Sequence, residues 1–422
     1  MQLKVILNYV EKHKGFIYSD IEWDGNAKEK TLLIKVKPRK GSKGFCSACG
    51  KRGTCYDTGP ARRFQYVPLW GIVVFLIYSM RRIDCRTCSA VTVEMIPWAD
   101  GKKQITKSFE WFLSAWAKKL CWKEVADTFN SSWDTVFRAV EMAVEWGRMR
   151  MDLTAIASIG VDEIQWQCGH KYLTLVYQID AHCKRLLWIG EARTEATIRS
   201  FFDWFTPERS ACLRFVASDM WKPYLKVIAE KASTAVHVLD RFHIMAHINK
   251  AINEVRAGEA RKMKERGLEP VLKNSRWCWL KRPENLTPTQ DILLNGLLKM
   301  NLKTVKSYIL KEDFQNFWTY KSPAWAGKFL DDWCNRTMRS RIDPMKKVAK
   351  MLRRHRPLLL NWFVAKGTIS SGVVEGLNNK VKLVTRKAYG FKSPRTIKAA
   401  LYHNLGGLPE PKLTHRFCMK RQ

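Results

Sequence analysis

Four aspartates in the middle of the chain each follow a short apolar run of the kind that forms a β-strand: Asp162, Asp180, Asp219 and Asp240. Asp180 opens an expected hairpin turn, where Asp commonly hydrogen-bonds to the nearby backbone. Asp162 follows Ile-Gly-Val on an expected central strand, and Asp219 follows Phe-Val-Ala-Ser on another. Hard cations such as Mg²⁺ prefer oxygen ligands, so carboxylates at adjacent strand ends can share metal ions. Asp162 and Asp219 are therefore candidate ligands.

A third acidic ligand would have to come from a helix that packs across the same sheet. The run from Ser370 and Ser371 onward opens such a helix, with the serines placed as an N-cap and apolar side chains at helical spacing. The neighbouring face of this helix is polar and carries Glu375, Asn378, Asn379, Lys382 and Arg386. That face suits a metal ligand beside a phosphate backbone. Taken by itself, however, Glu375 is better explained as an acid favoured by the helix dipole near an N-terminus.

Two pairs of cysteines near the N-terminus predict a zinc site. Cys46 with Cys49 and Cys85 with Cys88 are each spaced Cys-x-x-Cys, and 36 positions (85 − 49) leave room for a hairpin between the pairs. Four thiolates on two such turns form a closed tetrahedral site of the structural type. Four buried free cysteines are the plainer alternative, and a thioredoxin-like redox motif lacks its βαβ context. Cys55 is a spare thiol that could replace one ligand.

The charge balance of the 422-residue chain indicates a polyanionic partner. The chain has 74 Lys and Arg against 39 Asp and Glu, a net charge of +35, far above what solubility requires. A hydrophobic fraction of 46% excludes a mainly disordered chain. No apolar run reaches the roughly 20 residues that span a bilayer, and no signal peptide is recognisable. We therefore expect a cytoplasmic protein with reduced cysteines that binds nucleic acid and not a membrane.

Residues 105 to 148 carry three apolar stripes at helical spacing and predict three helices. The second and third are separated by Asn-Ser-Ser, a tight turn that also supplies an N-cap. Two short helices, a turn and a longer helix are the pattern of a helix-turn-helix, whose last helix reads DNA. Trp133, Asp134, Thr135 and Arg138 would then face the DNA groove. A three-helix packing unit without DNA contacts is the alternative.

The segment from about 153 to 250 predicts an α/β domain. Three expected antiparallel strands begin near residue 159 and are followed by alternating helices and strands, which is the order of a ribonuclease-H-like domain. Residues 244 to 355 interrupt this order, because they are helical, rich in Trp and very basic near their end. The cations of that basic stretch are Arg336, Arg339, Arg341, Lys346, Lys347, Lys350, Arg353, Arg354 and Arg356.

Four motifs together resemble the ISL-three family of bacterial insertion-sequence transposases. They are Gly160-Val161-Asp162-Glu163, Ser218-Asp219-Met220-Trp221-Lys222-Pro223-Tyr224, Asp240-Arg241-Phe242-His243, and Ser371-Gly372-x-x-Glu375-Gly376-x-Asn378-Asn379. The cysteine pairs and the helix-turn-helix precede these motifs in the order found in that family. The resemblance therefore covers nearly the whole chain.

The resemblance implies a DDE transposase with an α/β, ribonuclease-H-like catalytic core. An all-α insertion interrupts the core, and a small β zinc-binding domain and a helix-turn-helix precede it. The expected boundaries are 1–98 for the N-terminal β region with its four-cysteine zinc-binding domain, 99–152 for the helix-turn-helix, 153–250 for the first part of the core, 251–360 for the basic helical insertion, 361–410 for the last part of the core with the catalytic Glu helix, and 411–422 for a basic tail.

By the same motifs, Asp162, Asp219 and Glu375 are the catalytic acids and hold Mg²⁺ or Mn²⁺. The resemblance implies a two-metal mechanism in which water cleaves DNA at the element's end and the freed 3′-hydroxyl then attacks target DNA. Asp240 and His243 match a further motif and are not expected to be ligands, although His243 would touch DNA or the scissile phosphate. The other side chains expected at DNA are Trp133, Thr135, Arg138, Lys382, Arg386, Arg353 and Arg354.

Three other functions are compatible with the residues. They are a non-catalytic zinc and helix-turn-helix regulator, a ribonuclease-H-like nuclease without strand transfer, and a basic packaging protein. The resemblance favours the transposase, which must pair two DNA ends and is therefore expected to act as a homodimer or larger assembly. Its expected location is the bacterial cytoplasm, in association with the nucleoid.

Overall fold

The computed structural model describes residues 3–27, 29–269, 271–365 and 371–411, without the side chain of Ser371. The chain forms two compact units. Unit 1 comprises Met1–Asp152 together with Lys382–Gln422, and unit 2 comprises Leu153–Val381. Within the described residues, no helix is both long enough and apolar enough to cross a bilayer. The expected basic tail lies almost wholly outside the described residues.

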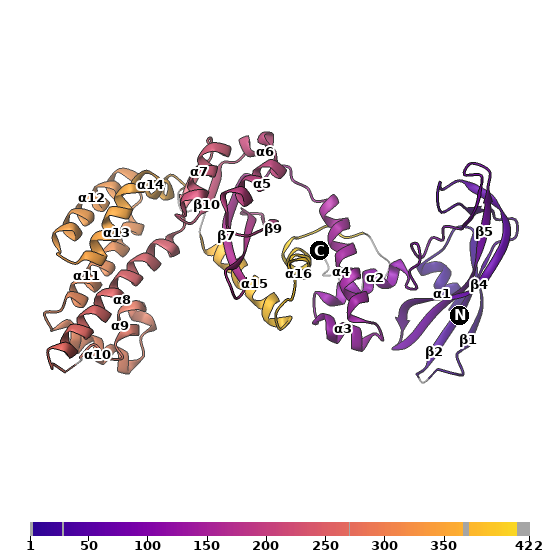
Figure 1. The fold of residues 1–422 in the computed structure, drawn as a ribbon, viewed down its shortest axis with the longest axis horizontal. Coiled ribbons are helices and arrows are strands. Elements are labelled where there is room, and N and C mark those ends of the chain that lie inside the picture. The colour runs from indigo at the N-terminus through magenta and orange to yellow at the C-terminus, as the bar shows by residue number, and fades with distance from the viewer. Residues whose placement is uncertain (1–2, 28, 270, 366–370, 412–422) are drawn as a thin grey trace. The chain divides into compact units, whose positions relative to one another are not determined.

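Unit 1 begins with a short helix and a six-stranded sheet (Figure 1). The elements are α1 (Leu3–Val10), β1 (Phe16–Trp23), β2 (Thr31–Pro38), β3 (Gly44–Phe45), β4 (Arg52–Leu69), β5 (Ile72–Cys85) and β6 (Ala90–Val93). The strand order is β1-β2-β5-β4-β3, and β6 pairs with β5. Trp98 is fully buried, and the rings of Phe16, Phe64 and Tyr78 meet it edge to face. The β-prone runs at 31–37 and 73–78 lie within β2 and β5.

Three helices follow the sheet, at the positions that the apolar stripes predict. They are α2 (Lys107–Ala117), α3 (Trp122–Thr128) and α4 (Trp133–Met149). The hydroxyl of Ser132 caps α4 by accepting a hydrogen bond from the Thr135 amide, as the Asn-Ser-Ser turn predicts. The amide of Gln65 on β4 donates to the carbonyls of Phe129 and Asn130, both at 3.2 Å. This contact holds the turn before α4 against the sheet.

The C-terminal helix α16 (Pro394–Leu405) packs against α4 and completes unit 1. The guanidinium of Arg395 binds the Glu141 carboxylate through two hydrogen bonds, of 2.5 and 2.6 Å. The guanidinium of Arg148 lies 4.3 Å from the ring centroid of Tyr402. The segment 361–410, expected to be the last part of the core, is thus divided between the two units.

Unit 2 contains a five-stranded mixed sheet in the order β11-β10-β7-β8-β9. Its strands are β7 (Ser158–Gln167), β8 (Lys171–Asp180), β9 (Cys183–Glu191), β10 (Phe215–Ser218) and β11 (Val236–Leu239). Strands β7, β8 and β9 are antiparallel, whereas β10 and β11 run parallel to β7. The connecting helices are α5 (Glu195–Phe205), α6 (Pro207–Ala211) and α7 (Lys222–Lys231). The predicted order of elements from 159 to 239 is confirmed.

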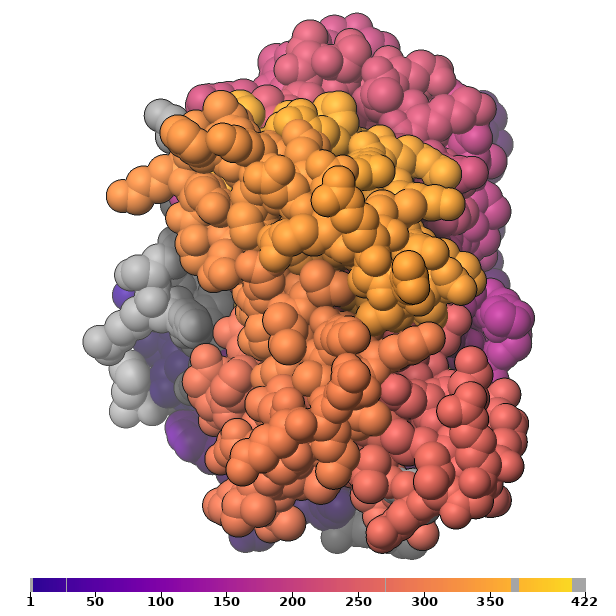
Figure 2. Space-filling view, turned by 90° about the vertical axis from the view of Figure 1, so that its left-hand side faces the viewer, coloured from indigo at the N-terminus to yellow at the C-terminus, as the bar shows by residue number. Residues whose placement is uncertain are grey.

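A helical region follows β11 within unit 2. It comprises α8 (Arg241–Glu265), α9 (Arg276–Leu280), η1 (Pro283–Asn285), α10 (Pro288–Leu298), α11 (Lys303–Gln315), η2 (Asn316–Thr319), α12 (Pro323–Arg339), α13 (Asp343–Arg354) and α14 (Arg356–Val364). Trp279, Trp318 and Trp333 lie in its core, whereas Trp277 and Trp325 are exposed. In Figure 2 these helices, salmon to orange, fill the front of the view as one closely packed surface. Most of these tryptophans therefore form the hydrophobic core of the helical region.

Candidate functional site

Three aspartates form a row across the parallel part of the unit 2 sheet. Ala217 of β10 is paired with Gly160 of β7, and Ser218 of β10 with Leu239 of β11. Asp219 directly follows β10, so continuing these registers leads from Asp219 to Asp162 on one side and to Asp240 on the other. The two candidate ligands that the strand patterns singled out therefore occupy adjacent positions, and Asp240 extends the row.

Asp162 is connected to helix α15 (Ser371–Lys387) by a side-chain amide. One carboxylate oxygen of Asp162 accepts a hydrogen bond from the Asn378 amide nitrogen, and the other accepts from the Glu163 backbone N–H at 2.8 Å. The amide oxygen of Asn378 accepts in turn from the Tyr177 hydroxyl at 2.7 Å. Burial raises the pKa of Asp162 despite these hydrogen bonds. The helix is thus tied to the row by a specific polar contact.

Arg193 bridges two carboxylates of the site and was not anticipated. Its guanidinium lies 2.9 Å from Glu163 Oε1 and 3.2 Å from Asp219 Oδ2, and 4.6 Å from the ring centroid of Trp221. Burial, together with the charge of Asp219, raises the pKa of Glu163 to about 7 even though Arg193 opposes this shift. Glu163 stands next to Asp162 in the sequence, but no local pattern signals that Arg193 reaches it.

Glu375 lies on α15, three residues before Asn378, and is exposed. Side chains three apart share a helix face, so Glu375 is on the face that contacts Asp162. The three predicted acids do not, however, form a compact ligand cluster: within the described part of the chain, only a set of cysteines does. Asp162 lies on β7 and Asp219 directly after the neighbouring strand β10, and Glu375 lies on the adjoining helix.

The donor atoms of the row fit a divalent cation such as Mg²⁺. They are carboxylate oxygens, the ligands that hard cations prefer. The second carboxylate oxygen of Glu163, Oε2, is buried and has no hydrogen-bond partner among the described residues. A buried, unpartnered carboxylate oxygen is costly unless a cation or water completes it. The carboxylates of the row, together with the unpartnered oxygen of the neighbouring Glu163, are therefore compatible with metal binding.

Helix α15 packs on the sheet where Gly160 leaves room for it. Val374, Leu377 and Val381 are buried, as the helical spacing predicts. A Cβ atom at Gly160 would lie 2.6 Å from Val374 Cγ2, which is closer than real Cβ contacts allow. The serines expected to cap this helix, Ser370 and Ser371, lie outside the residues whose side chains are described. Gly160 therefore sets how closely the helix approaches Asp162.

Replacing Gly160 by Ala is expected to destabilise the protein by about 1–3 kcal/mol, because the added methyl group must push α15 away from β7. Gly376→Ala is the matched control, since a Cβ atom there meets nothing within 4 Å and alanine favours helix. Thermal denaturation of both variants checks this expectation. Equal melting temperatures for the two variants would contradict the close packing of α15 on the sheet.

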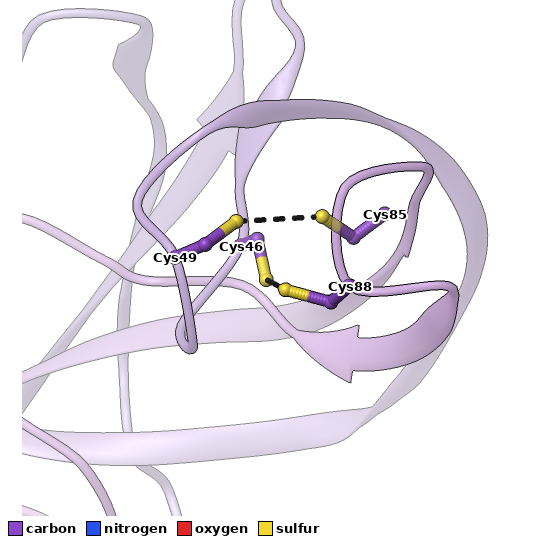
Figure 3. A group of neighbouring side chains, drawn as sticks. All are labelled: Cys46, Cys49, Cys85 and Cys88. Carbon is purple, nitrogen blue, oxygen red and sulfur yellow. Dashed lines mark hydrogen bonds between the residues drawn. The ribbon is translucent and has the colours of Figure 1, made fainter.

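The four N-terminal cysteines converge in unit 1 (Figure 3). The sulfur of Cys46 lies 3.9 Å from that of Cys88, and the sulfur of Cys49 lies 3.5 Å from that of Cys85. All four sulfurs lie within 4.8 Å of one another. These separations are too long for disulfides, whose sulfurs are about 2.05 Å apart. They match the roughly 3.8 Å between thiolates in a tetrahedral site with Zn–S bonds of about 2.3 Å.

The surroundings of the cysteine cluster fit a structural zinc ion. The hydroxyl of Thr92 on β6 lies 3.1 Å from the Cys46 sulfur, and the Ala48 backbone N–H donates to the same sulfur at 3.4 Å. Such contacts orient a thiolate ligand. Cys55 is exposed, and its thiol donates to the Asp57 carbonyl, so it is not a fifth member. The arrangement of four thiols is compatible with zinc.

The side chains expected at DNA lie on four helices and are mostly exposed. Arg138 on α4 forms an ion pair with Asp134 at 2.7 Å, which leaves its outer face free. On α8, His243 Nε2 lies 3.9 Å from Asp240 Oδ2, close to the carboxylate row. The other members are Trp133 and Thr135 on α4, Arg353 and Arg354 on α13, and Lys382 and Arg386 on α15.

The basic stretch of the helical region is partly neutralised by acids. Arg336 pairs with Asp313 at 2.6 Å and Arg356 binds both oxygens of Asp331 at 2.9 Å. Lys346 pairs with Asp343, three residues before it. The surface here is therefore less positive than the sequence alone indicates.

Comparison with known proteins identifies the class of protein. Residues 159–401 match the sequence profile of a family described as transposase. Because this match covers more than half of the chain, the chain belongs to the ISL-three family of DDE transposases. It is 30% identical over 421 residues to the transposase for insertion sequence element IS1557 of Mycobacterium tuberculosis, with 93% of each chain covered. It is 27% identical over 383 residues to the transposase for insertion sequence element IS1001 of Bordetella parapertussis, with 90% of this chain and 92% of that protein covered.

Proposed function

We propose that this transposase cleaves DNA at the ends of its insertion sequence and transfers the resulting strand to target DNA, using Asp162, Asp219 and Glu375 as a metal-binding triad. The β7–β11 sheet with α15 would be a ribonuclease-H-like core, and helices α8 to α14 would be an insertion into it. The observation that supports this proposal is the pairing of Ala217 with Gly160, two residues before Asp219 and Asp162, with α15 hydrogen-bonded to Asp162.

The proposed chemistry divides between the cations and the protein. Bound divalent cations would supply a Lewis acid that activates the attacking oxygen and stabilises the leaving oxygen at phosphorus. Asp162 and Asp219 would hold them, and Glu375 would join once α15 and the DNA are in place. Asn378 keeps the Asp162 carboxylate in one orientation. Arg193 offsets the repulsion between Glu163 and Asp219, so that the acids can remain close together.

Unit 1 would recognise the DNA ends. The cysteine cluster, holding one zinc ion, would stabilise the end of the six-stranded sheet, and α4 would enter a DNA groove with Trp133, Thr135 and Arg138. The contact from Gln65 to the turn before α4 supports a fixed presentation of that helix. Because two ends must be joined, we propose that the active form on DNA is at least a dimer, in association with the nucleoid.

A strand-transfer assay tests the proposed function against a simple nuclease. Pre-cleaved end DNA with a free 3′-hydroxyl is incubated with purified protein, plasmid target and Mg²⁺. We expect joined products, which disappear when Mg²⁺ is omitted and when the terminal 3′-hydroxyl is replaced by hydrogen. Nicking of intact ends without any joining of pre-cleaved ends would identify a nuclease instead. Binding of the ends without either reaction would identify a regulator.

A further inference from the structure

A pocket of about 370 Å³ in unit 2 gathers three cations. Arg241 at the start of α8, Arg282 after α9 and Lys311 on α11 contribute to its lining. As far as the described residues go, no aspartate or glutamate lines it. A partly buried pocket with several positive charges and no acid is a favourable environment for an anion.

The two arginines of this pocket lack a counter-charge. Lys311 has one, because its ammonium lies 2.8 Å from a carboxylate oxygen of Glu312 and 2.8 Å from the Trp279 carbonyl. Neither Arg241 nor Arg282 forms an ion pair with any acid among the described residues. Arg241 instead lies 5.2 Å from the ring centroid of Trp318. Two guanidinium groups without an acid remain available to an anion from outside the chain.

The electrostatics of Arg241 agree with this geometry. Burial, and then the positive charge of Arg282, lower the pKa of Arg241. The two side chains are thus close enough to repel each other, and this repulsion costs free energy in the absence of an anion. A bound phosphate would convert the repulsion into two attractive, hydrogen-bonded contacts.

The pocket adjoins the carboxylate row. Arg241 directly follows Asp240, whose backbone N–H donates to the Ser218 carbonyl at 2.9 Å. Gly372, three residues before Glu375 on α15, also lines the pocket. The pocket therefore lies where the first residues of α8 and α15 meet, and both of these helices begin next to acids of the site.

We propose that Arg241 and Arg282 bind a backbone phosphate of the DNA strand that lies at the carboxylate row. The planar guanidinium group presents paired N–H donors that match two oxygens of a phosphate, and it stays charged at neutral pH. One phosphate held at this point would fix how far the strand advances past the acids. This inference rests on the proposed function, because it assumes that DNA is the substrate of the row.

The test compares two single-charge losses in one unit. Arg282→Gln removes an exposed arginine without an ion pair, whereas Arg199→Gln removes one that is paired with Glu195 and Glu230 on another helix pair. DNA binding is measured by fluorescence anisotropy without added Mg²⁺ at several salt concentrations. We expect Arg282→Gln to weaken binding about tenfold and to reduce the slope of log K against log salt by about 1. Identical curves for the two variants would overturn the proposal.

The position of the phosphate can be mapped independently of folding. End DNA is prepared with single phosphates replaced by neutral methylphosphonates. At one position this replacement should weaken binding by wild-type protein but should not weaken binding by Arg282→Gln any further. Arg241→Gln should likewise lose no further affinity at that position. Loss of its contact with Trp318 alone would not produce an effect confined to one phosphate. Losses that add at every position would mean that neither arginine touches a backbone phosphate.

A free phosphate compound is the other source of the same chemistry. Inorganic phosphate at millimolar concentration would then raise the melting temperature of wild-type protein but not of Arg282→Gln, with DNA affinity equal in both, and this result would also overturn the proposal. All binding is measured without added Mg²⁺, so a failure of cleavage or joining in Mg²⁺ would contradict the proposed function and would not affect the phosphate contact.

Discussion

Asp162→Asn is expected to lower Mg²⁺-dependent cleavage and strand transfer by at least about a thousandfold, which corresponds to about 4 kcal/mol in the activation barrier. The amide keeps the shape of the side chain and its hydrogen bond from the Glu163 backbone, but it removes the negative charge that holds a cation. Product formation on labelled end DNA measures the loss. Affinity for the same DNA without added Mg²⁺ should change by less than about threefold, since Asp162 is not proposed to contact the backbone.

A control variant that also loses one carboxylate tests whether the effect of Asp162→Asn is specific to that position. Asp203→Asn on α5 removes an exposed carboxylate whose partner is Lys231 at 3.8 Å, and should leave activity unchanged. Glu375→Gln on the exposed face of α15 should inactivate the protein as strongly as Asp162→Asn, without lowering the melting temperature. If the Asp162, Asp219 and Glu375 variants each kept full activity, these three acids would not be the metal-binding triad.

Cys85→Ser is expected to abolish zinc binding and to unfold the outer part of the N-terminal sheet. Wild-type protein should contain about one zinc per chain, and structural zinc contributes about 10–16 kcal/mol of binding free energy in small zinc domains. Losing even a few kcal/mol would lower the melting temperature of this region by more than about 10 °C. Metal analysis and thermal denaturation of the full chain measure the two effects.

The matched control for the zinc prediction is Cys55→Ser, because Cys55 is exposed and its thiol lies outside the cluster. It should keep both the zinc and the melting temperature. A chelator should reproduce the Cys85→Ser phenotype in wild-type protein. Metal-free protein that melts at the same temperature as the zinc-loaded form would show that the four thiols are a packing feature.

Much of the candidate site could be predicted because its signals are local. The sequence places Asp219 correctly, directly after β10, but the expectation that Asp162 ends a strand is wrong, since β7 continues to Gln167. Their closeness in the fold follows from the parallel pairing of β7 with β10. The two cysteine pairs are recognised directly from their Cys-x-x-Cys spacing in the sequence. Arg193 could not be found in this way, since its long side chain reaches Glu163 and Asp219 across strands that are far apart in the chain.

The apolar pattern of the sequence predicts the buried helix faces, whereas the pattern of cations does not predict which of them remain unpaired. The cations from 336 to 356 predict a very basic stretch, but acids from elsewhere in the helical region neutralise Arg336 and Arg356. Periodicity records which face of a helix is apolar and not which acid lies opposite a given cation. The uncompensated pair Arg241 and Arg282 is invisible for the same reason, because the two residues are 41 positions apart (282 − 241) and meet only in the fold.

The packing of α16 on α4 has a consequence for the order in which the protein matures. Because a chain is synthesised from its N-terminus, α4 leaves the ribosome long before Arg395 and Tyr402, which cover one side of it. All of unit 2 is made in the interval. A nascent or truncated chain would therefore carry the sheet and the carboxylate row of unit 2 before unit 1 is complete, and only the full-length chain would have both units folded.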